Sequence, residues 1–504
     1  MADTREAPLQ QDIVNQLAAQ GWLVGDPARY DRERALYPED LIAYFQEAHP
    51  RQWERFAANN KNPETVLLDK TARELEKAGT LEVLRHGFKV PAARITLCTF
   101  QPDHGMNADT LAQYHANRLR VVPEVSYSPH ARPSEYNPRL DLVLLVNGLP
   151  TATLELKSEF KQTVGHAIRQ YQQDRPPRDP KTRRDEPLLK FKRGALVHFA
   201  VSQAEVAMTT RLAGKDTGFL PFNRGTPDGG AGNPPAASED DYQTDYLWKE
   251  VLAPDAWLHI LGRFLHLEVK HSQDFHGKWH KKESLIFPRY HQWDAVRKLI
   301  AATRAEGAGE RYLIQHSAGS GKSNSIAWTA HQLAALYNDE GGKLFDSVVV
   351  VTDRTVLDSQ LQDTVRQFER ASGVVQPITR DEGGSKSARL AEALKQNTRI
   401  IIVTIQTFPA LFEALNEHPD LAAGTYAVVA DEAHSSQTGA SAHKLKTILG
   451  MERPEGEEIS AEELLDAAVD ARRPTKQISY YAFTATPKGK TLELFGRPPN
   501  PDEP

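Results

Sequence analysis

The chain has 504 residues, 40% of them hydrophobic, so it is long enough for more than one buried core, and its length suggests roughly three domains. The net charge of −6 argues against a protein that binds nucleic acid over its whole surface, although it is compatible with a locally basic channel. A single cysteine, Cys98, excludes an internal disulfide framework and a four-cysteine zinc site, and it fits a reducing cytoplasm.

The N-terminus lacks the basic and apolar layout of a signal peptide. No apolar run approaches the roughly 20 residues that span a bilayer. We therefore expect a cytoplasmic protein without a membrane partner.

In the first half of the chain, the patterns predict helices at 12–20 and 38–46 and paired strands at 140–146 and 151–156. Asn147-Gly148 lies between the two strands, and both residues tolerate the positive φ of a tight turn. The two strands are therefore predicted to form a hairpin.

A further strand is predicted at 195–201. Three stretches rich in charged residues, glycine or proline are expected to be linkers or surface excursions: 174–193, 221–241 and 453–474. The basic part of the first, 178–193, fits a phosphate contact and a solvated loop about equally well. The Lys-rich segment that joins the two halves contains four histidines, but it lacks the glutamate of a helical zinc motif. We expect it to be a solvated linker, and its histidines are His266, His271, His276 and His280.

In the second half, short β-rich runs alternate with helical patterns. This alternation predicts an open α/β domain with a parallel sheet that is buried on both faces, and ligands of such sheets bind beyond the carboxyl ends of the strands. The predicted strands are 312–315, 347–352, 399–404, 425–430 and 478–483, with helices at 323–337 and 354–370.

The segment 316–323 (HSAGSGKS) follows a predicted strand and begins a predicted helix, as a phosphate-binding loop does. Around Ser320, Gly319 and Gly321 would let backbone N–H groups surround the phosphates. Lys322 would reach the β- and γ-phosphates, and the Ser323 hydroxyl would bind Mg²⁺. His316 stands where the strict pattern has its first glycine, and the alternative is a Gly/Ser turn with a solvated lysine.

Two further motifs follow predicted strands. Asp431 suits Mg²⁺ coordination through water, and Glu432 suits polarisation of an attacking water. The segment 484–487 (TATP) ends the next strand. Because the three motifs occur in order and each at a strand end, they favour an ATP site over coincidence.

Residues 287–489 resemble the superfamily 2 helicases and translocases. The resemblance implies that Lys322 and Ser323 form motif I, that 431–434 (DEAH) form motif II and that 484–487 form motif III. It implies nucleotide contacts for His434 and adenine recognition by Gln292. It also implies accessory roles for Asp353 and Arg354 in motif Ia, for Thr404 in the region that touches a DNA strand, and for Thr484 and Thr486 in motif III. The alternative for the motif Ia pair is an ordinary helix start.

A second group of residues lies on the predicted hairpin. Residues two apart on a strand point to the same face, so Glu155 and Lys157 project together, and Asp141 lies across the hairpin. Two carboxylates form an oxygen site for Mg²⁺, and a nearby lysine can orient or activate the water that attacks a phosphodiester. The alternative is a salt-bridged surface hairpin.

The run 136–150 (YNPRLDLVLLVNGLP), together with 244–248 (TDYLW) and 288–292 (PRYHQ), resembles the R subunit of type I restriction enzymes. In that family a PD-(D/E)-x-K nuclease precedes a superfamily 2 motor. The resemblance implies an α/β chain with a nuclease domain and connecting region at 1–265, built on a mixed sheet with flanking helices. A first RecA-like parallel α/β lobe is implied at 266–504.

The same resemblance implies an ATP-dependent site-specific deoxyribonuclease that translocates and cleaves double-stranded DNA. Asp141 and Glu155 would hold Mg²⁺, and the cofactors would be ATP and Mg²⁺. The implied partners are methyltransferase and specificity subunits. Of the family's accessory features, Gln170 fits a Q-x-x-x-Y element in which Asp174 replaces the tyrosine, and Asp12 substitutes for a glutamate of the first helix.

Only 17 residues follow Pro487, too few for the second lobe of such a motor. We therefore expect an isolated chain of this length to be an incomplete motor. Two alternatives are the motor and nuclease part of a single-chain restriction-modification enzyme, and a short partner-binding form that does not translocate. A type III restriction motor is disfavoured because its nuclease follows the motor.

Overall fold

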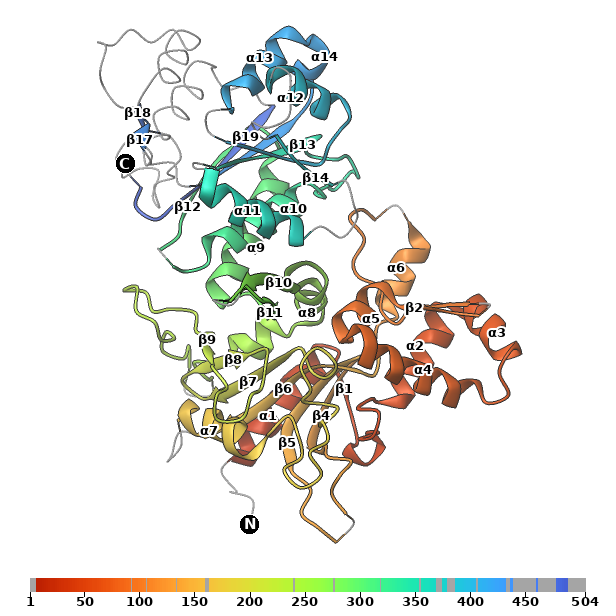
Figure 1. The fold of residues 1–504 in the computed structure, drawn as a ribbon. Helices are drawn as coiled ribbons and strands as arrows, with labels where there is room; N and C mark the ends of the chain where they lie inside the picture. Colours follow the sequence, from red (N-terminus) through yellow and green to blue (C-terminus); the bar gives the residue numbers. More distant parts are fainter. Residues whose placement is uncertain are drawn as a thin grey trace. The chain divides into compact units, whose positions relative to one another are not determined.

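The computed structural model of the chain consists of two compact units, Met1–His291 and Gln292–Pro504 (Figure 1). The boundary predicted from the sequence lies at 265/266. In the structure, the segment 266–291 belongs to the first compact unit. None of the helices that the structure describes is long and apolar enough to cross a membrane. The described residues are 6–91, 93–105, 107–132, 134–158, 163–238, 241–274, 277–317, 319–352, 355–368, 374–378, 386–404, 407–431, 436–437, 459–460 and 477–487.

The first unit is built on a mixed seven-stranded sheet. Two strand pairs, β1 with β4 and β6 with β7, are parallel, and the other neighbours are antiparallel. In spatial order the strands are β1 (Leu23–Val24), β4 (Leu119–Ser126), β5 (Arg139–Val146), β6 (Leu149–Lys157), β7 (Val197–Ser202), β8 (Val206–Thr209) and β9 (Leu220–Pro221).

The predicted hairpin of β5 and β6 is confirmed. Asn147 and Gly148 have φ values of 50° and 78°, which is the left-handed region that this turn needs. A Cβ on Gly148 would lie 2.3 Å from the carbonyl oxygen of Tyr37, so only glycine fits. The turn therefore packs directly against the start of the helix that follows Tyr37.

Helices cover this sheet, and α7 packs against β6 and β7 while α1 packs against β4 and β6. The predicted helices at 12–20 and 38–46 are confirmed, although the first begins earlier, at Glu6. The helices are α1 (Glu6–Ala19), α2 (Pro38–Ala48), α3 (Pro50–Ala58), α4 (Pro63–Ala78), α5 (Thr80–His86), α6 (Ala108–His115), α7 (Val164–Asp174) and α8 (Pro254–His259). Short hairpins are β2 (Phe88–Val90) with β3 (Ala93–Ile95), and β10 (His266–Gln273) with β11 (Trp279–Ile286).

The expectation of a solvated linker is wrong in one respect, because His266, His271 and His280 lie in the antiparallel hairpin β10–β11, while His276 lies outside the described residues. The strands were not predicted because polar residues, among them lysines and histidines, lie on both faces of the ribbon, so polar and apolar residues do not alternate along it. The predicted excursion 221–241 contains only the last residue of β9, whereas the predicted excursion 453–474 lies outside the described residues except for two residues of a short strand.

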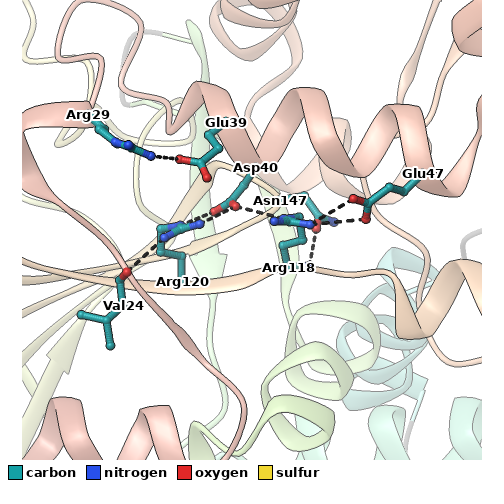
Figure 2. A network of polar contacts seen from close by, with 8 residues as sticks. All are labelled: Val24, Arg29, Glu39, Asp40, Glu47, Arg118, Arg120 and Asn147. Carbon is teal, nitrogen blue, oxygen red and sulfur yellow. Dashed lines mark hydrogen bonds and ion pairs between the residues drawn. The ribbon is translucent and has the colours of Figure 1, made fainter.

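A buried carboxylate fastens α2 to the sheet. Asp40 is fully buried, and its oxygens accept hydrogen bonds from Arg118 Nε at 3.1 Å and from Arg120 Nε at 2.5 Å and Nη2 at 2.8 Å. Figure 2 shows Asp40 between these two arginines, which lie two residues apart on or beside β4. Arg118 also contacts Glu47 on the same helix. The network therefore holds α2 at one position along β4.

Replacing Asp40 with alanine is expected to lower the free energy of unfolding of the first unit by about 3 to 5 kcal/mol, because Arg120 would be buried without its partner. Urea denaturation followed by tryptophan fluorescence measures the change. Glu39→Ala is the matched control, since this neighbouring carboxylate pairs with Arg29 at exposed positions, where an ion pair contributes at most about 1 kcal/mol. Equal losses in the two variants would contradict the role of Asp40.

The second unit has a six-stranded sheet whose strand pairs are all parallel. The five strands predicted in this half are confirmed, and the short β14 escapes the sequence patterns. In spatial order the strands are β12 (Arg311–Gln315), β19 (Ile478–Thr484), β16 (Tyr426–Asp431), β13 (Ser347–Thr352), β15 (Ile400–Thr404) and β14 (Val375–Pro377).

Its central strands are buried along their whole length, as the continuous apolar runs predict. The helices are α9 (Tyr290–Glu306), α10 (Lys322–Leu333), α11 (Thr355–Gln367), α12 (Lys386–Lys395), α13 (Pro409–Glu417) and α14 (Pro419–Ala422). A two-stranded ribbon pairs β17 (Ser436–Gln437) with β18 (Ile459–Ser460). The chain is thus a mixed α/β protein in which the second unit carries a parallel sheet.

Candidate active sites

Three loops of the second unit leave neighbouring strands at the same edge of the sheet. In the register of the sheet, Gln315 at the end of β12 pairs with Thr484 at the end of β19, and Asp431 at the end of β16 pairs with Phe483. The backbone N–H of His316 continues this pairing by donating to the carbonyl of Thr484 at 2.8 Å. This edge is the carboxyl end of the sheet, where open α/β folds bind their ligands.

The glycine-rich loop between β12 and α10 has the geometry that a phosphate loop needs. Gly319 and Gly321 have φ values of 74° and 88°, and α10 begins at Lys322 directly after them. Such a backbone turns its N–H groups toward the helix axis, where the positive end of the helix dipole favours an anion. The φ of Gly321 lies in a region that residues with a Cβ rarely adopt, so this position favours glycine.

Two charged residues and one amide meet at this loop. Lys322 Nζ lies 3.0 Å from Asp431 Oδ1, and both side chains are largely buried. The Gln292 amide donates to the carbonyl oxygens of Ser320 and Gly321, at 3.1 Å each. A cation at a helix start beside a carboxylate at a strand end fits a nucleoside triphosphate with Mg²⁺. The ammonium can face phosphate oxygens, and the carboxylate can face the metal.

His316 takes the position of the first glycine of the strict pattern, and the structure shows how it fits. Its ring is buried and bonds through Nδ1 to Ser320 Oγ and through Nε2 to Ser325 Oγ at 3.0 Å. The imidazole therefore braces the loop against α10. Sequence reasoning treated His316 only as a departure, because its two partners become visible only in three dimensions.

The remaining predicted residues of this unit are placed as follows. Ser323 lies half-buried in the first turn of α10, and Thr404 ends β15 with its hydroxyl 3.0 Å from that of Thr407. Thr484 is buried and Thr486 is exposed two residues beyond it. Four predicted residues, Asp353, Arg354, Glu432 and His434, lie outside the described residues.

In the first unit, the hairpin β5–β6 brings the two predicted carboxylates together. Asp141 Oδ2 accepts a hydrogen bond from the backbone N–H of Leu156 at 2.6 Å, which places it beside the Glu155–Lys157 end of β6. Glu155 is fully buried and Lys157 is 8% exposed. Burial raises the pKa of Glu155 well above its ordinary value, and the negative charge of Asp141 is the second cause of this increase. Such mutual repulsion arises when two carboxylates share one site.

Sequence reasoning missed a third partner of this site. Arg175 Nε donates to Glu155 Oε1 at 2.7 Å, and both side chains are at most 5% exposed. Arg175 Nη2 also donates to the carbonyl of Arg139 on β5 at 2.5 Å. The other oxygen, Glu155 Oε2, is buried and has no hydrogen-bond partner among the described residues. A buried carboxylate oxygen without a partner is costly, and a cation placed there would offset that cost.

Arg175 is the residue directly after α7, where the backbone has left the helical conformation, so helical spacing does not predict its contact with Glu155. Tyr171 on α7 contacts Thr153, and Arg175 contacts Glu155. The two positions on β6 are themselves two apart and share a face.

The accessory predictions for this site have mixed placements. Asp12 accepts a hydrogen bond from the Tyr242 hydroxyl at 2.6 Å. Gln10, two residues earlier on α1, is the side chain that reaches the site, because its amide donates to the Asp141 carbonyl at 2.7 Å and to Glu124 at 3.2 Å. Gln170 is half-buried on α7.

The described part of the chain contains no group of three or more His, Cys, Asp or Glu residues that could hold a metal ion. Asp141 and Glu155 are the two predicted carboxylates that the structure brings to this strand end. Mg²⁺ commonly binds proteins through one or two carboxylates, with water and substrate phosphates completing its shell. The donor set thus suits a metal that also contacts a phosphodiester.

The predicted basic stretch 178–193 is largely neutralised by ion pairs. Arg178 and Lys190 contact Asp185, Lys190 also contacts Glu76, and Lys192 contacts Glu283. These contacts favour the interpretation as a structural loop over a phosphate site.

A buried histidine lies beneath the carboxylate site. Thr153 Oγ1 is 2.7 Å from His198 Nδ1 and 2.8 Å from the Tyr171 hydroxyl. Burial lowers the pKa of His198 to about 3. The unfolded chain takes up a proton at this residue near pH 6.5, whereas the folded chain does so only near pH 3, so stability decreases as the pH falls between these values.

We expect His198→Gln to reduce the pH dependence of unfolding in that window by up to about 1.4 kcal/mol per pH unit. Urea denaturation at several pH values measures the slope for parent and variant. His86→Gln is the control, because His86 is exposed on α5 and its side chain pairs with the exposed Glu82. Parallel slopes for parent and His198→Gln would contradict a neutral buried imidazole.

Comparisons with known proteins match both units. Residues 3–217 match the family model described as type I restriction enzyme R protein N terminus, and residues 291–497 match the SWI2/SNF2 ATPase model. The chain is 27% identical over 372 residues to the type I restriction enzyme HindI endonuclease subunit of Haemophilus influenzae, which covers 71% of this chain and 31% of that protein.

A putative type I restriction enzyme MjaVIIIP endonuclease subunit of Methanocaldococcus jannaschii is 24% identical over 322 residues, covering 59% of this chain and 27% of that protein. The chain therefore spans less than a third of the length of these curated relatives. Among solved structures, a fragment of a putative HsdR subunit from Vibrio vulnificus is 16% identical with a TM-score of 0.25, covering 75% of this chain and 54% of that one.

Proposed function

Because the chain is homologous to the R subunits of type I restriction enzymes, with their N-terminal region and a SWI2/SNF2 ATPase domain, we propose that it supplies the nuclease and part of the motor of such an enzyme. The first unit would cleave double-stranded DNA and the second would be the first RecA-like lobe of an ATP-driven translocase. We propose translocation for a longer protein and not for this chain by itself. The matched relatives are more than three times as long as the segment that they share with this chain.

The observation that carries the nuclease proposal is the orphaned oxygen of Glu155. Arg175 occupies one carboxylate oxygen, Asp141 lies beside the strand end, and Glu155 Oε2 is buried without a partner. Asp141 and Glu155 would hold Mg²⁺, which when bound supplies a Lewis acid for the phosphodiester.

The protein's own side chains have separate tasks in this proposal. Lys157 projects from the same face of β6 as Glu155, so its ammonium can orient the attacking water and take part in moving its proton. Arg175 is a positioning residue that fixes the rotamer of Glu155 and thereby keeps Oε2 directed to the metal position. Gln10 holds the backbone of Asp141 from α1.

In the second unit, the glycine loop and Lys322 would bind the phosphates of ATP, while Ser323 and Asp431 would hold its Mg²⁺. Gln292, whose amide already contacts the loop carbonyls, would sense the bound nucleotide from α9. The proposal assigns polarisation of the attacking water to Glu432 and a nucleotide contact to His434, as the family pattern implies.

We further propose that the enzyme acts with methyltransferase and specificity subunits and that its substrate is double-stranded DNA. The matched relatives are named as endonuclease subunits of type I restriction enzymes, a name that supports further subunits beside the one that cuts.

Binding of Mg²⁺ in the absence of nucleotide tests the nuclease site directly. Glu155→Gln is expected to raise the dissociation constant for Mg²⁺ by at least about tenfold, since it removes a charged oxygen ligand of a two-carboxylate site. Isothermal titration calorimetry, or Mn²⁺ paramagnetic resonance, measures the change.

Glu186→Gln provides a matched control. Glu186 is also buried in the first unit, and one of its oxygens likewise lacks a hydrogen-bond partner among the described residues, but its other oxygen accepts from Ser128. If Glu186→Gln weakens the metal as much as Glu155→Gln does, the site is not where we place it.

A further inference from the structure

The hairpin β10–β11 projects from the first unit as an arm that is anchored only at its base. His266 and Leu285 are buried there, Thr210 Oγ1 donates to the carbonyl of Leu285 at 2.7 Å, and Lys192 pairs with Glu283 at 2.9 Å. Beyond that base, all eight strand residues at 270–273 and 279–282 are exposed. Because successive strand residues face opposite sides, the ribbon is uncovered on both faces.

We call the described residues 270–274 and 277–282 the basic arm. Its charged side chains, apart from histidines, are four lysines and one aspartate: Lys270, Lys278, Lys281, Lys282 and Asp274. The aspartate is engaged within the arm, because it accepts from His280 at 2.6 Å and from the backbone N–H of Lys278 at 2.9 Å. The outward charge of the arm is therefore positive, in a chain whose net charge is negative.

Like charges face each other across the two strands. In the register of the hairpin, Lys270 pairs with Lys282. Directly opposed cations destabilise a strand pair, and a two-stranded ribbon exposed on both faces has little burial to offset that cost. Acidic partners lie nearer the base, where Lys270 contacts Glu268 at 2.9 Å and Lys281 contacts Glu283 at 2.8 Å. Polyanion binding would remove the cross-strand repulsion.

An aromatic side chain stands at the end of the arm. Trp279 pairs with Gln273 at the last register position, and it is 66% exposed. Tryptophan combines a large apolar ring with a polar N–H, so it suits a contact that is apolar on one side and polar on the other. A flat ring beside lysines is the combination that nucleic acids accept, through groove or base contact and phosphate contact together.

We propose that the basic arm is a contact surface for duplex DNA, with its lysines at the phosphate backbone and Trp279 in a groove. The major groove admits a two-stranded β-ribbon, and four residues of strand at about 3.4 Å each give the arm a reach of roughly 14 Å. Phosphate contacts carry no sequence information, so the arm holds DNA without selecting its sequence. This inference rests on the proposed function, since it names where the first unit grips its substrate.

The test compares DNA binding by the chain and by two triple variants, measured as fluorescence anisotropy of a labelled duplex of arbitrary sequence over a range of salt concentrations. Lys270→Ser/Lys281→Ser/Lys282→Ser is expected to bind at least about tenfold more weakly at low salt. It should also reduce the slope of log affinity against log salt by roughly 2.7, because each phosphate contact contributes about 0.9.

The matched control removes three exposed lysines from helices α4, α9 and α12, as Lys77→Ser/Lys298→Ser/Lys395→Ser. It changes the net charge equally and is expected to leave the salt slope unchanged. Trp279→Ala is expected to weaken binding about fivefold or more at an unchanged slope, because its ring contact is not ionic. Thermal unfolding of each variant verifies that the exposed substitutions leave the fold intact.

The outcomes separate the arm from the proposed function. If the arm variant and the control bind duplex equally well, the arm proposal is wrong, and duplex binding by the parent still supports the proposed function. Loss of single-strand affinity with duplex affinity retained would overturn the assignment to duplex DNA. If the parent chain itself fails to bind duplex while it binds Mg²⁺ATP, both the arm and the nuclease proposal fall.

Discussion

Replacing Lys157 with alanine is expected to lower the rate of DNA cleavage by roughly 10² to 10⁴, the range that one positioned proton-transfer group contributes. Lys157 is 8% exposed and stands two residues from the fully buried Glu155 on the same face of β6. The substitution removes the only cation that we assign to the attacking water. Arg175 does not replace it, because its guanidinium is bound to Glu155 Oε1. Plasmid cleavage by the complex assembled with its proposed partner subunits measures the rate.

Two controls define this result. Lys77→Ala removes an exposed lysine of α4 in the same unit and should leave cleavage unchanged. Binding of Mg²⁺ by Lys157→Ala should stay near the parent value, because the two carboxylates are intact. Cleavage at the parent rate would show that the nuclease centre lies elsewhere.

Replacing Lys322 with alanine is expected to raise the dissociation constant for Mg²⁺ATP at least about 30-fold, which corresponds to about 2 kcal/mol for a charge-assisted contact to phosphate. The ammonium lies at the start of α10 and 3.0 Å from Asp431, so no other part of the loop replaces it. The substitution also leaves Asp431 without its cation, and its carboxylate then repels the nucleotide. Fluorescence titration with a labelled ATP analogue measures the affinity.

Lys395→Ala is the matched control in the same unit, because Lys395 is exposed in the last turn of α12. It should bind the analogue as the parent does. Unchanged affinity in Lys322→Ala would mean that the loop after β12 is an ordinary turn, and the motor proposal would lose its basis.

Local chemistry, repeated along the chain, determined the elements of this protein. The apolar runs at Ser347–Thr352 and Ile478–Thr484 are strands because β-branched and aromatic side chains fill both faces of a covered sheet. Asn147-Gly148 makes a turn because both residues accept positive φ. The phosphate loop and the D…E-x-K pattern could be read in the same way, since each depends on residues that are neighbours along one strand or one turn.

Only the tertiary structure decided which distant side chains share these sites. The ion pair of Arg175 with Glu155 joins α7 to β6, and the network of Asp40 with Arg118 and Arg120 joins α2 to β4. Neither pairing follows from spacing, because charged residues are common and each has many possible partners until a helix packs at one position on the sheet. Burial then makes the choice strict, since an ionised group in the core without its partner costs several kcal/mol.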